Sequence, residues 1–485
     1  MSSTQTSSTE PSPANTPPTN KPPSNCQYVV SRNGIILPWQ QIHQQYRGVD
    51  GSSGTCCDTS SNQLRDKNNH NHNEPLDSNT LLQLLPRGAY TTCRTVKGGS
   101  HIYQFDYHVT RLANSAKSIL NNDTKDNNAT SLLHTTSSNH PIQHDRLLGS
   151  SVEEVVDQLQ HVTNVAWEHD MALKCIRTTL REFCTCYGIV LPDDELSGEE
   201  EGDDDGVDEK VEFKITLLAT WEKKKKKEEH GHPNDTKSHS TSYESVLYCH
   251  VGLLQPKNVS AASTSSSTAT STSKPLHTRV LIHGHGRENA LAKDSKWVLD
   301  REKLTKPSAA VDDKGDISEE DWHQPFEEII LINDNGELLE GTQTNFYVVS
   351  GTDHHLQSNS IITANEGILY GSVRDSVLRA CRHHDIPVQL RPPTLKDLKS
   401  ASGVFMSSTS RWVMSVDEVC LGDLLSFQND DVASEEEGRG GEGRGSVDKK
   451  KRRNDKSYFY GACKTTEDIR RWVLEDVESR STPLY

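Results

Sequence analysis

The sequence predicts a mixed α/β (α+β) fold of two domains, because segments with strand and helix patterns follow one another on both sides of a Ser/Thr-rich stretch at 256–276. In the first part of the chain, the patterns predict strands at 86–102, 211–221, 245–254 and 279–283, and helices at 106–120, 151–159 and 171–187. In the second part, they predict strands at 329–349, 388–391, 404–406 and 412–419, and helices at 290–303, 371–384 and 395–400.

Changes in composition set the expected domain boundaries. Of the 485 residues only 32% are hydrophobic and 6% aromatic, so the polar low-complexity tracts are expected to be disordered. One such tract is 121–145. The expected organisation is a disordered tail at 1–26, a smaller N-terminal α+β domain with low-complexity insertions at 27–275, a C-terminal α/β domain at 276–426, a disordered insertion at 427–456 and a C-terminal helical segment at 457–485.

Residues 331–349 are expected to form a β-hairpin that carries one buried carboxylate. The turn falls at Asp334-Asn335-Gly336, where Asn-Gly supplies the positive φ angles that a tight hairpin requires. The returning strand leads through Leu339 into Glu340 and then into an apolar run. A carboxylate in such a place costs free energy unless a cation or a hydrogen-bond donor meets it. We therefore expect Glu340 to have a partner of that kind.

Charge and composition exclude several classes of protein. The formal net charge of −17 argues against a dedicated nucleic-acid-binding protein. No apolar run reaches membrane-spanning length and the N-terminus has no apolar signal core, so we expect no membrane association and a cytoplasmic location; an organelle transit peptide is the alternative. The 11 cysteines lack zinc-ligand spacing, and the His-x-His pairs that start at His70 and His283 are isolated, so no metal site is expected.

Five motifs occur in an order that resembles the fold-type IV (class IV) aminotransferases. They are RGAYTTCRT with FDYHVTRLANSA, then NALAKDSKWVLDREKL, EGTQTNFYVV, GILYGSVRDSVL and MSSTSRWVMSV. That family uses pyridoxal phosphate and contains branched-chain aminotransferases, D-amino-acid aminotransferases and aminodeoxychorismate lyases. The likeness covers most of 86–425 outside the insertions, and the second motif looks most like the branched-chain-aminotransferase-like members. Five motifs in order are far more specific than one.

The resemblance implies which residues bind and activate the cofactor in the C-terminal domain. Lys293 stands where the family carries its Schiff-base lysine, and Lys296 is a nearby competitor whose motif position fits less well. A lysine with a lowered pKa can bond to the cofactor and also move the substrate α-proton. Glu340 stands where a carboxylate would hold the proton of the cofactor's ring nitrogen, which would be its partner.

A phosphate group requires N–H donors at a helix N-terminus and a cation. Gly371, Ser372 and Val373 open the predicted helix at 371–384, and Gly371 allows close approach of the backbone. By resemblance, Thr409 belongs to the second phosphate-binding turn and Arg111 is the arginine contributed by the N-terminal domain.

A substrate carboxylate requires a positive or N–H-rich pocket, and Tyr90, Arg94 and Arg374 are the available candidates. The resemblance implies a transaminase that moves an amino group from an amino acid, with the branched-chain type first, to a 2-oxo acid. It also implies a homodimer. Aminodeoxychorismate lysis and D-amino-acid transamination are alternatives within the fold. A catalytically silent relative acting as an interaction scaffold is the alternative from another class. The amino donor, its stereochemistry and the role of the insertions stay open.

Overall fold

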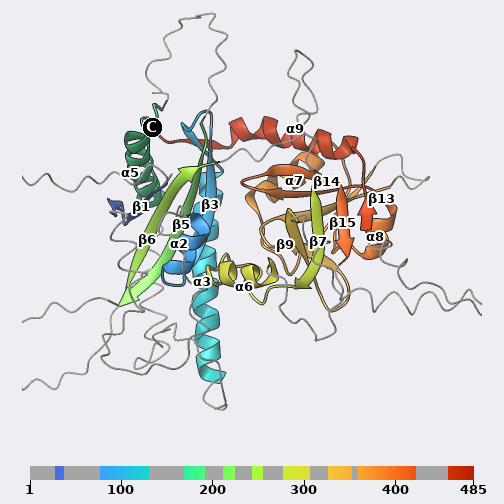
Figure 1. The fold of residues 1–485 in the computed structure, drawn as a ribbon, viewed down its shortest axis with the longest axis horizontal. Helices are drawn as coiled ribbons and strands as arrows, with labels where there is room; N and C mark the ends of the chain where they lie inside the picture. The colour runs from blue at the N-terminus through green and yellow to red at the C-terminus, as the bar shows by residue number, and fades with distance from the viewer. Residues whose placement is uncertain are drawn as a thin grey trace, which may run out of the picture.

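The computed structural model describes residues 28–37, 77–129, 169–191, 211–223, 243–254, 277–305, 326–351, 359–421 and 457–485. Within these ranges the chain forms two β-sheets with helices packed against them, which confirms the mixed α/β class (Figure 1). The helix predicted at 151–159, the tail at 1–26 and the insertion at 427–456 lie outside the described residues.

The first sheet is antiparallel, with the described strands in the order β17-β4-β3-β5-β6-β1-β2. Its strands are β1 (Tyr28–Arg32), β2 (Ile35–Ile36), β3 (Ala89–Val96), β4 (His101–Tyr103), β5 (Phe213–Lys223), β6 (Tyr243–Leu253) and β17 (Ser481–Pro483). Successive side chains of a strand point to opposite faces. Ala89 and Cys93 accordingly pack with α3 (Phe105–Ala129) and α5 (His169–Tyr187), whereas Tyr90 packs with α2 (Ser78–Leu84) and α6 (Lys296–Thr305).

The second sheet is mixed, with the described strands in the order β12-β11-β10-β9-β8-β7-β15-β16, while β13 pairs with β10 and β14. Its strands are β7 (Arg279–His285), β8 (Glu328–Ile332), β9 (Leu338–Gly341), β10 (Asn345–Ser350), β11 (Ile361–Thr363), β12 (Val388–Leu390), β13 (Ala401–Ser408), β14 (Trp412–Val416), β15 (Glu418–Leu421) and β16 (Ser457–Phe459). In β10, Tyr347 and Val349 pack with α7 (Ser372–His383) and α9 (Lys464–Ser479), whereas Phe346 and Val348 pack with α8 (Leu395–Ser400).

The hairpin predicted at 331–349 is present as β8, β9 and β10, but its first turn differs from the expectation. Only Gly336 has a positive φ, of 77°, and Asn335 does not. The Asn333 side chain accepts hydrogen bonds from the backbone N–H groups of Asn335 and Glu337, at 3.0 and 2.9 Å, so one left-handed residue is enough to close the turn.

Two helices have other bounds than their local patterns predict. The helix expected at 290–303 begins only at Lys296, because the residues before it form extended hydrogen bonds with β3, including Tyr90 N–H to Lys293 O at 2.8 Å. Conversely, α3 runs to Ala129 and so enters the tract at 121–145 that we expected to be disordered. Once a helix is nucleated by a packed face, polar residues can extend it.

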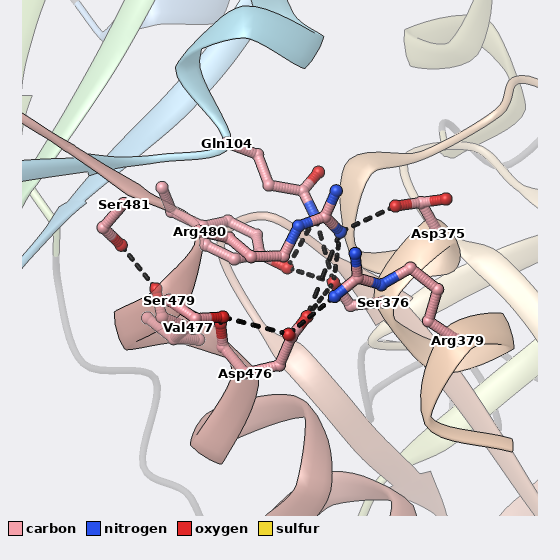
Figure 2. A network of polar contacts seen from close by, with 10 residues as sticks. Gln104, Asp375, Ser376, Arg379, Asp476, Val477, Ser479, Arg480 and Ser481 are labelled. Carbon is pink, nitrogen blue, oxygen red and sulfur yellow. Dashed lines mark hydrogen bonds and ion pairs between the residues drawn. The ribbon is translucent and has the colours of Figure 1, made fainter. Parts of the chain in front are cut away.

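The C-terminal segment connects the two sheets. The expected helical segment at 457–485 contains α9 together with two short strands, and β17 adds to the first sheet beside β4. Figure 1 shows α9 crossing above the second sheet and the C-terminus lying beside α5. In Figure 2, Arg480 Nη1 contacts Asp375 Oδ2 of α7 at 2.7 Å, and the Arg480 carbonyl accepts from Gln104 N–H at 2.9 Å.

The buried face of α9 generates a stability prediction. Ile469 is 0% exposed and Leu474 is 40% exposed on the same helix. Ile469→Ala should lower the free energy of unfolding by about 2–5 kcal/mol, because it removes packed methylene groups and leaves a cavity. Leu474→Ala, the control, should change it by about 0.5 kcal/mol. Urea denaturation of both variants measures the difference, and equal losses would contradict the packing described for α9.

Candidate active site

A cleft between the two sheets collects most of the residues selected from the sequence. It encloses about 890 Å³, counting the space open to solvent. The first sheet contributes residues of β3 and β5 together with α2, α3 and α6, and the second contributes the ends of β9 and β10, the start of α7 and the β13–β14 turn. Lys293, Glu340 and Arg111 all line this cleft. Clefts at the junction between two parts of a fold are ordinary sites for small ligands.

Glu340 is buried at the end of β9, as expected, and it has both kinds of partner that we anticipated. Its Oε1 accepts from Arg287 Nε at 3.0 Å and Arg287 Nη2 at 2.5 Å, and its Oε2 accepts from the Leu369 backbone N–H at 3.0 Å. Burial raises the pKa of Glu340, while Arg287 and the Leu369 N–H oppose the rise. Arg287 was not among the residues selected from the sequence. Its one local signal is a position at the end of a strand, six residues before Lys293.

Lys293 extends into the cleft from the extended residues before α6. Its backbone N–H donates to Ser115 Oγ at 3.0 Å, and its Nζ lies 4.9 Å from the centre of the Tyr90 ring. Burial, and then the nearby charges of Arg111, Arg301, Arg287 and Lys214, hold the pKa of Lys293 well below its usual range. Lys293 therefore loses its proton at a lower pH than an ordinary lysine, and the neutral amine is the form that acts as a nucleophile or base.

The competitor lysine occupies a different environment. Lys296 is exposed at the first position of α6 and does not line the cleft. Its backbone N–H donates to Asp294 Oδ1 at 2.9 Å. Of the two lysines, Lys293 alone shares the cleft with Glu340.

The start of α7 forms an anion-binding corner. Gly371, Ser372, Val373 and Thr409 all line the cleft, and the hydroxyls of Ser372 and Thr409 lie 3.1 Å apart. No side chain caps this helix, so its first N–H groups are free to bind an anion. A Cβ at Gly371 would collide with Asn345 Oδ1, so glycine is required for the backbone to lie this close.

Arg111 reaches the same cleft from α3. Its Nη2 donates to Thr91 Oγ1 at 2.8 Å and to His108 Nδ1 at 3.0 Å, and its Nη1 donates to the Tyr370 carbonyl at 3.5 Å. Burial holds the pKa of His108 well below its usual range, so its Nδ1 can accept this bond. Among the described residues Arg111 Nε is buried without a hydrogen-bond partner. A buried guanidinium whose acceptors are neutral is suited to an anionic ligand.

The three candidates for binding the substrate carboxylate lie in different environments. Tyr90 lines the cleft beneath Lys293. Arg374 also lines it, but its Nη2 donates to the Ala364 carbonyl at 2.9 Å and to Asn365 Oδ1 at 3.1 Å. Arg94 is absent from the cleft lining, since it pairs with Glu212 and lies over the Trp412 ring, 4.3 Å from its centre.

A comparison with known protein families matches the part of the chain that supplies one side of this cleft. Residues 319–419 match the sequence model of the family described as amino-transferase class IV. The matched segment contains Glu340, Gly371, Ser372, Val373 and Thr409. Residues 319–419 of this chain are therefore similar to the class IV aminotransferases, in agreement with the resemblance found in the sequence. No curated protein matches the chain.

Several solved structures are similar at low sequence identity. A branched-chain aminotransferase from Thermoproteus uzoniensis is 12% identical with a TM-score of 0.43, over 94% of this chain and 99% of that chain. A hypothetical aminotransferase from Mycobacterium tuberculosis is 11% identical with a TM-score of 0.43, over 93% and 99%. A branched-chain aminotransferase from Escherichia coli is 13% identical with a TM-score of 0.36, over 81% and 86%.

Two further observations on the described residues concern membrane-spanning helices and metal-binding groups. Among the described residues, no helix is long and apolar enough to cross a membrane. Within the same ranges, no group of three or more His, Cys, Asp and Glu side chains could hold a metal ion. Of the two His-x-His pairs, the one that starts at His70 lies outside the described residues.

The lowered pKa of Lys293 predicts a pH-dependent stability in the cofactor-free protein. Between the lowered folded pKa and the ordinary value of 10.5, the unfolded chain binds one more proton than the folded one, so raising the pH through this window increases the free energy of unfolding. Below the window both states are protonated and this contribution is constant. Lys293→Met should lose the increase, and Lys296→Met should keep it.

Urea denaturation of the three proteins between about pH 7 and about pH 10 measures the effect, because the difference between variant and wild type isolates one lysine from the other titrating groups. A wild-type curve that runs parallel to that of Lys293→Met would contradict the perturbed environment.

Proposed function

We propose that this protein is a pyridoxal-phosphate-dependent aminotransferase that moves an amino group from an amino acid to a 2-oxo acid. The observation that carries the proposal is that Lys293, with a lowered pKa, shares one cleft with the buried Glu340 and with an uncapped helix N-terminus. These are an amine, a carboxylate and an anion site, and together they match the three functional ends of pyridoxal phosphate.

The described residues fit the cofactor. The phosphate would lie against the N–H groups of Ser372 and Val373 and the hydroxyl of Thr409, with Arg111 supplying the positive charge. The unpartnered Arg111 Nε and the close-packed Gly371 support this placement. When bound, pyridoxal phosphate supplies an electron-withdrawing ring that stabilises negative charge at the substrate α-carbon.

The residues of this chain would divide the remaining work. Lys293 would attach the cofactor through its Nζ and, once released, take a proton from the substrate α-carbon and return it. Glu340 would hold the proton of the ring nitrogen. Arg287 and the Leu369 N–H fix the position of that carboxylate, and they oppose the rise in pKa that burial causes. Tyr90, beneath Lys293, would exclude water from one side of the amine.

The finer assignments are part of the proposal. The resemblance favours branched-chain-type amino acids and a homodimer, with transamination of D-amino acids or lysis of aminodeoxychorismate as alternatives that would use the same residues. A lyase would release pyruvate from aminodeoxychorismate without an acceptor. We expect no such release and expect amino transfer to require a 2-oxo acid. Light scattering of the purified protein tests the dimer.

The lysine assignment predicts a spectroscopic result. Wild-type protein with added pyridoxal phosphate should show a visible absorption band. Lys293→Ala should lose the band, and its amino-transfer rate should fall by about 100-fold or more, because it lacks both the attachment point and the base. Lys296→Ala, the matched control from the same segment, should keep both.

Two outcomes would contradict the proposal. A wild-type protein that stays colourless with excess pyridoxal phosphate would exclude the cofactor and would favour the catalytically silent scaffold. Loss of the band in Lys296→Ala, with retention in Lys293→Ala, would transfer the role to Lys296.

A further inference from the structure

Glu328 is a buried carboxylate of the second sheet that has no part in the chemistry proposed above. It is the first residue of β8, is 4% exposed and does not line the cleft. A carboxylate at such depth costs free energy unless donors and a cation surround it. The groups that meet Glu328 therefore show what its charge stabilises.

The carboxylate of Glu328 binds two residues that line the cleft. Its Oε2 accepts from Arg411 Nη1 at 3.1 Å, and its Oε1 accepts from Thr342 Oγ1 at 2.5 Å. The same Oε1 accepts from the Ile329 backbone N–H at 3.1 Å. Hydrogen bonds to a charged group are shorter and stronger than those between neutral groups. Glu328 thus fastens two parts of the cleft from behind.

The first of these parts is the β13–β14 turn, which carries Thr409 and Arg411. Arg411 Nη2 also donates to the Glu327 carbonyl at 3.4 Å, so the guanidinium is held by two neighbouring residues. The next residue, Trp412, has a φ of 56°, which is rare for a bulky side chain and persists only where surrounding contacts enforce it. The ion pair with Glu328 is a contact of that kind, so the turn depends on it.

The second part is the loop that follows Glu340. Thr342 donates its backbone N–H to the Ile329 carbonyl at 2.9 Å, and its own carbonyl accepts from Trp297 Nε1 at 2.9 Å. Trp297 lies in the first turn of α6, four residues after Lys293. Thr342 therefore joins the end of β9 to the segment that carries the amine.

The packing around Glu328 leaves no room for it to move independently of this loop. A Cβ at Gly341 would lie 2.7 Å from Glu328 Cγ, so the backbone next to Glu340 rests directly on the Glu328 side chain. Because protein interiors are close-packed, a shift of Glu328 is transmitted to that backbone.

Resting on the proposed function, we propose that Glu328 is a positioning residue for the cofactor site. From behind the cleft it fixes the turn that carries Thr409 and the end of β9 that carries Glu340. Through Thr342 it also reaches the segment of Lys293. Glu328 acts only through the residues that it holds.

The affinity of the cofactor-free protein for pyridoxal phosphate tests this role, measured by titration of the visible band and of protein fluorescence. Glu328→Gln should raise the Kd by about 10- to 100-fold, because a neutral amide binds the donors more weakly and leaves the charge of Arg411 unpaired. Glu328→Asp keeps the charge, so its Kd should lie between those of wild type and Glu328→Gln.

Glu418 provides a matched control for a general loss of stability. It is the first residue of β15 in the same sheet, is 8% exposed and accepts from Arg279 Nε at 2.7 Å, away from the cleft lining. Glu418→Gln and Glu328→Gln should both lower the urea midpoint of the cofactor-free protein, because each leaves a buried arginine unpaired. Glu418→Gln should leave the Kd for pyridoxal phosphate within about 3-fold of wild type, since distant sites act independently.

A double variant tests the route through Thr342. Thr342→Val removes the hydroxyl that donates to Glu328, so this variant alone should also raise the Kd. In Glu328→Gln/Thr342→Val the Kd should be close to that of the more severe single variant, because residues in one hydrogen-bonded network do not act additively. Losses that multiply would contradict the route through Thr342.

The two proposals fail in different ways. If wild type binds pyridoxal phosphate and the Kd is unchanged in Glu328→Gln, or is raised as much in Glu418→Gln, the positioning role is overturned while the proposed aminotransferase stands. A wild-type protein that binds no pyridoxal phosphate would overturn both.

Discussion

Lys293 owes its place in the cleft to backbone hydrogen bonds that hold its segment against the start of β3. Tyr90 N–H donates to the Lys293 carbonyl at 2.8 Å, and Ser295 N–H donates to the Gly88 carbonyl at 2.9 Å. Gly88 is needed at this contact, because a Cβ there would collide with the carbonyl of Ala219. This short pairing, formed by residues about 200 positions apart in the chain, fixes the lysine on the first sheet while β9 brings Glu340 from the second.

The chemistry of the cleft depends on charges that burial makes costly. Lys293 is partly buried and lies among cations, and both conditions favour its neutral form. Glu340 experiences the opposite balance, since burial disfavours its charge while Arg287 and the Leu369 N–H favour it. One cleft can therefore keep an amine ready to accept a proton beside a carboxylate that is held in position by donors. A single acid–base pair in water would show neither property.

The relative position of the two sheets depends on a core that both of them share. Val96 and Tyr103 of the first sheet belong to the same buried cluster as Val373 of α7 and Val473 of α9. The C-terminal strand then returns to the first sheet, next to β4. Because α7 begins at the cleft, the packing that connects the sheets also positions its N-terminal N–H groups.

The sequence by itself determined the class of fold, most of the elements and the motif residues, because hydrophobic periodicity, turn chemistry and motif spacing are local properties of a chain. Glu340, Gly371 and Ser372 were selected from such patterns, Lys293 and Thr409 from the resemblance to a family, and the structure brings all five into one cleft. The short strands β1 and β2 and the helix α2 have weaker local signals and were not predicted.

Only the tertiary structure decided which distant groups meet. Glu340 pairs with Arg287, 53 residues away, and Arg301 meets Asn79, 222 residues away. The start of α6 was likewise decided by its neighbour, because β3 supplies hydrogen bonds that compete with a helical turn. Such contacts depend on how the elements pack, and the free energy of packing is not encoded in any one segment.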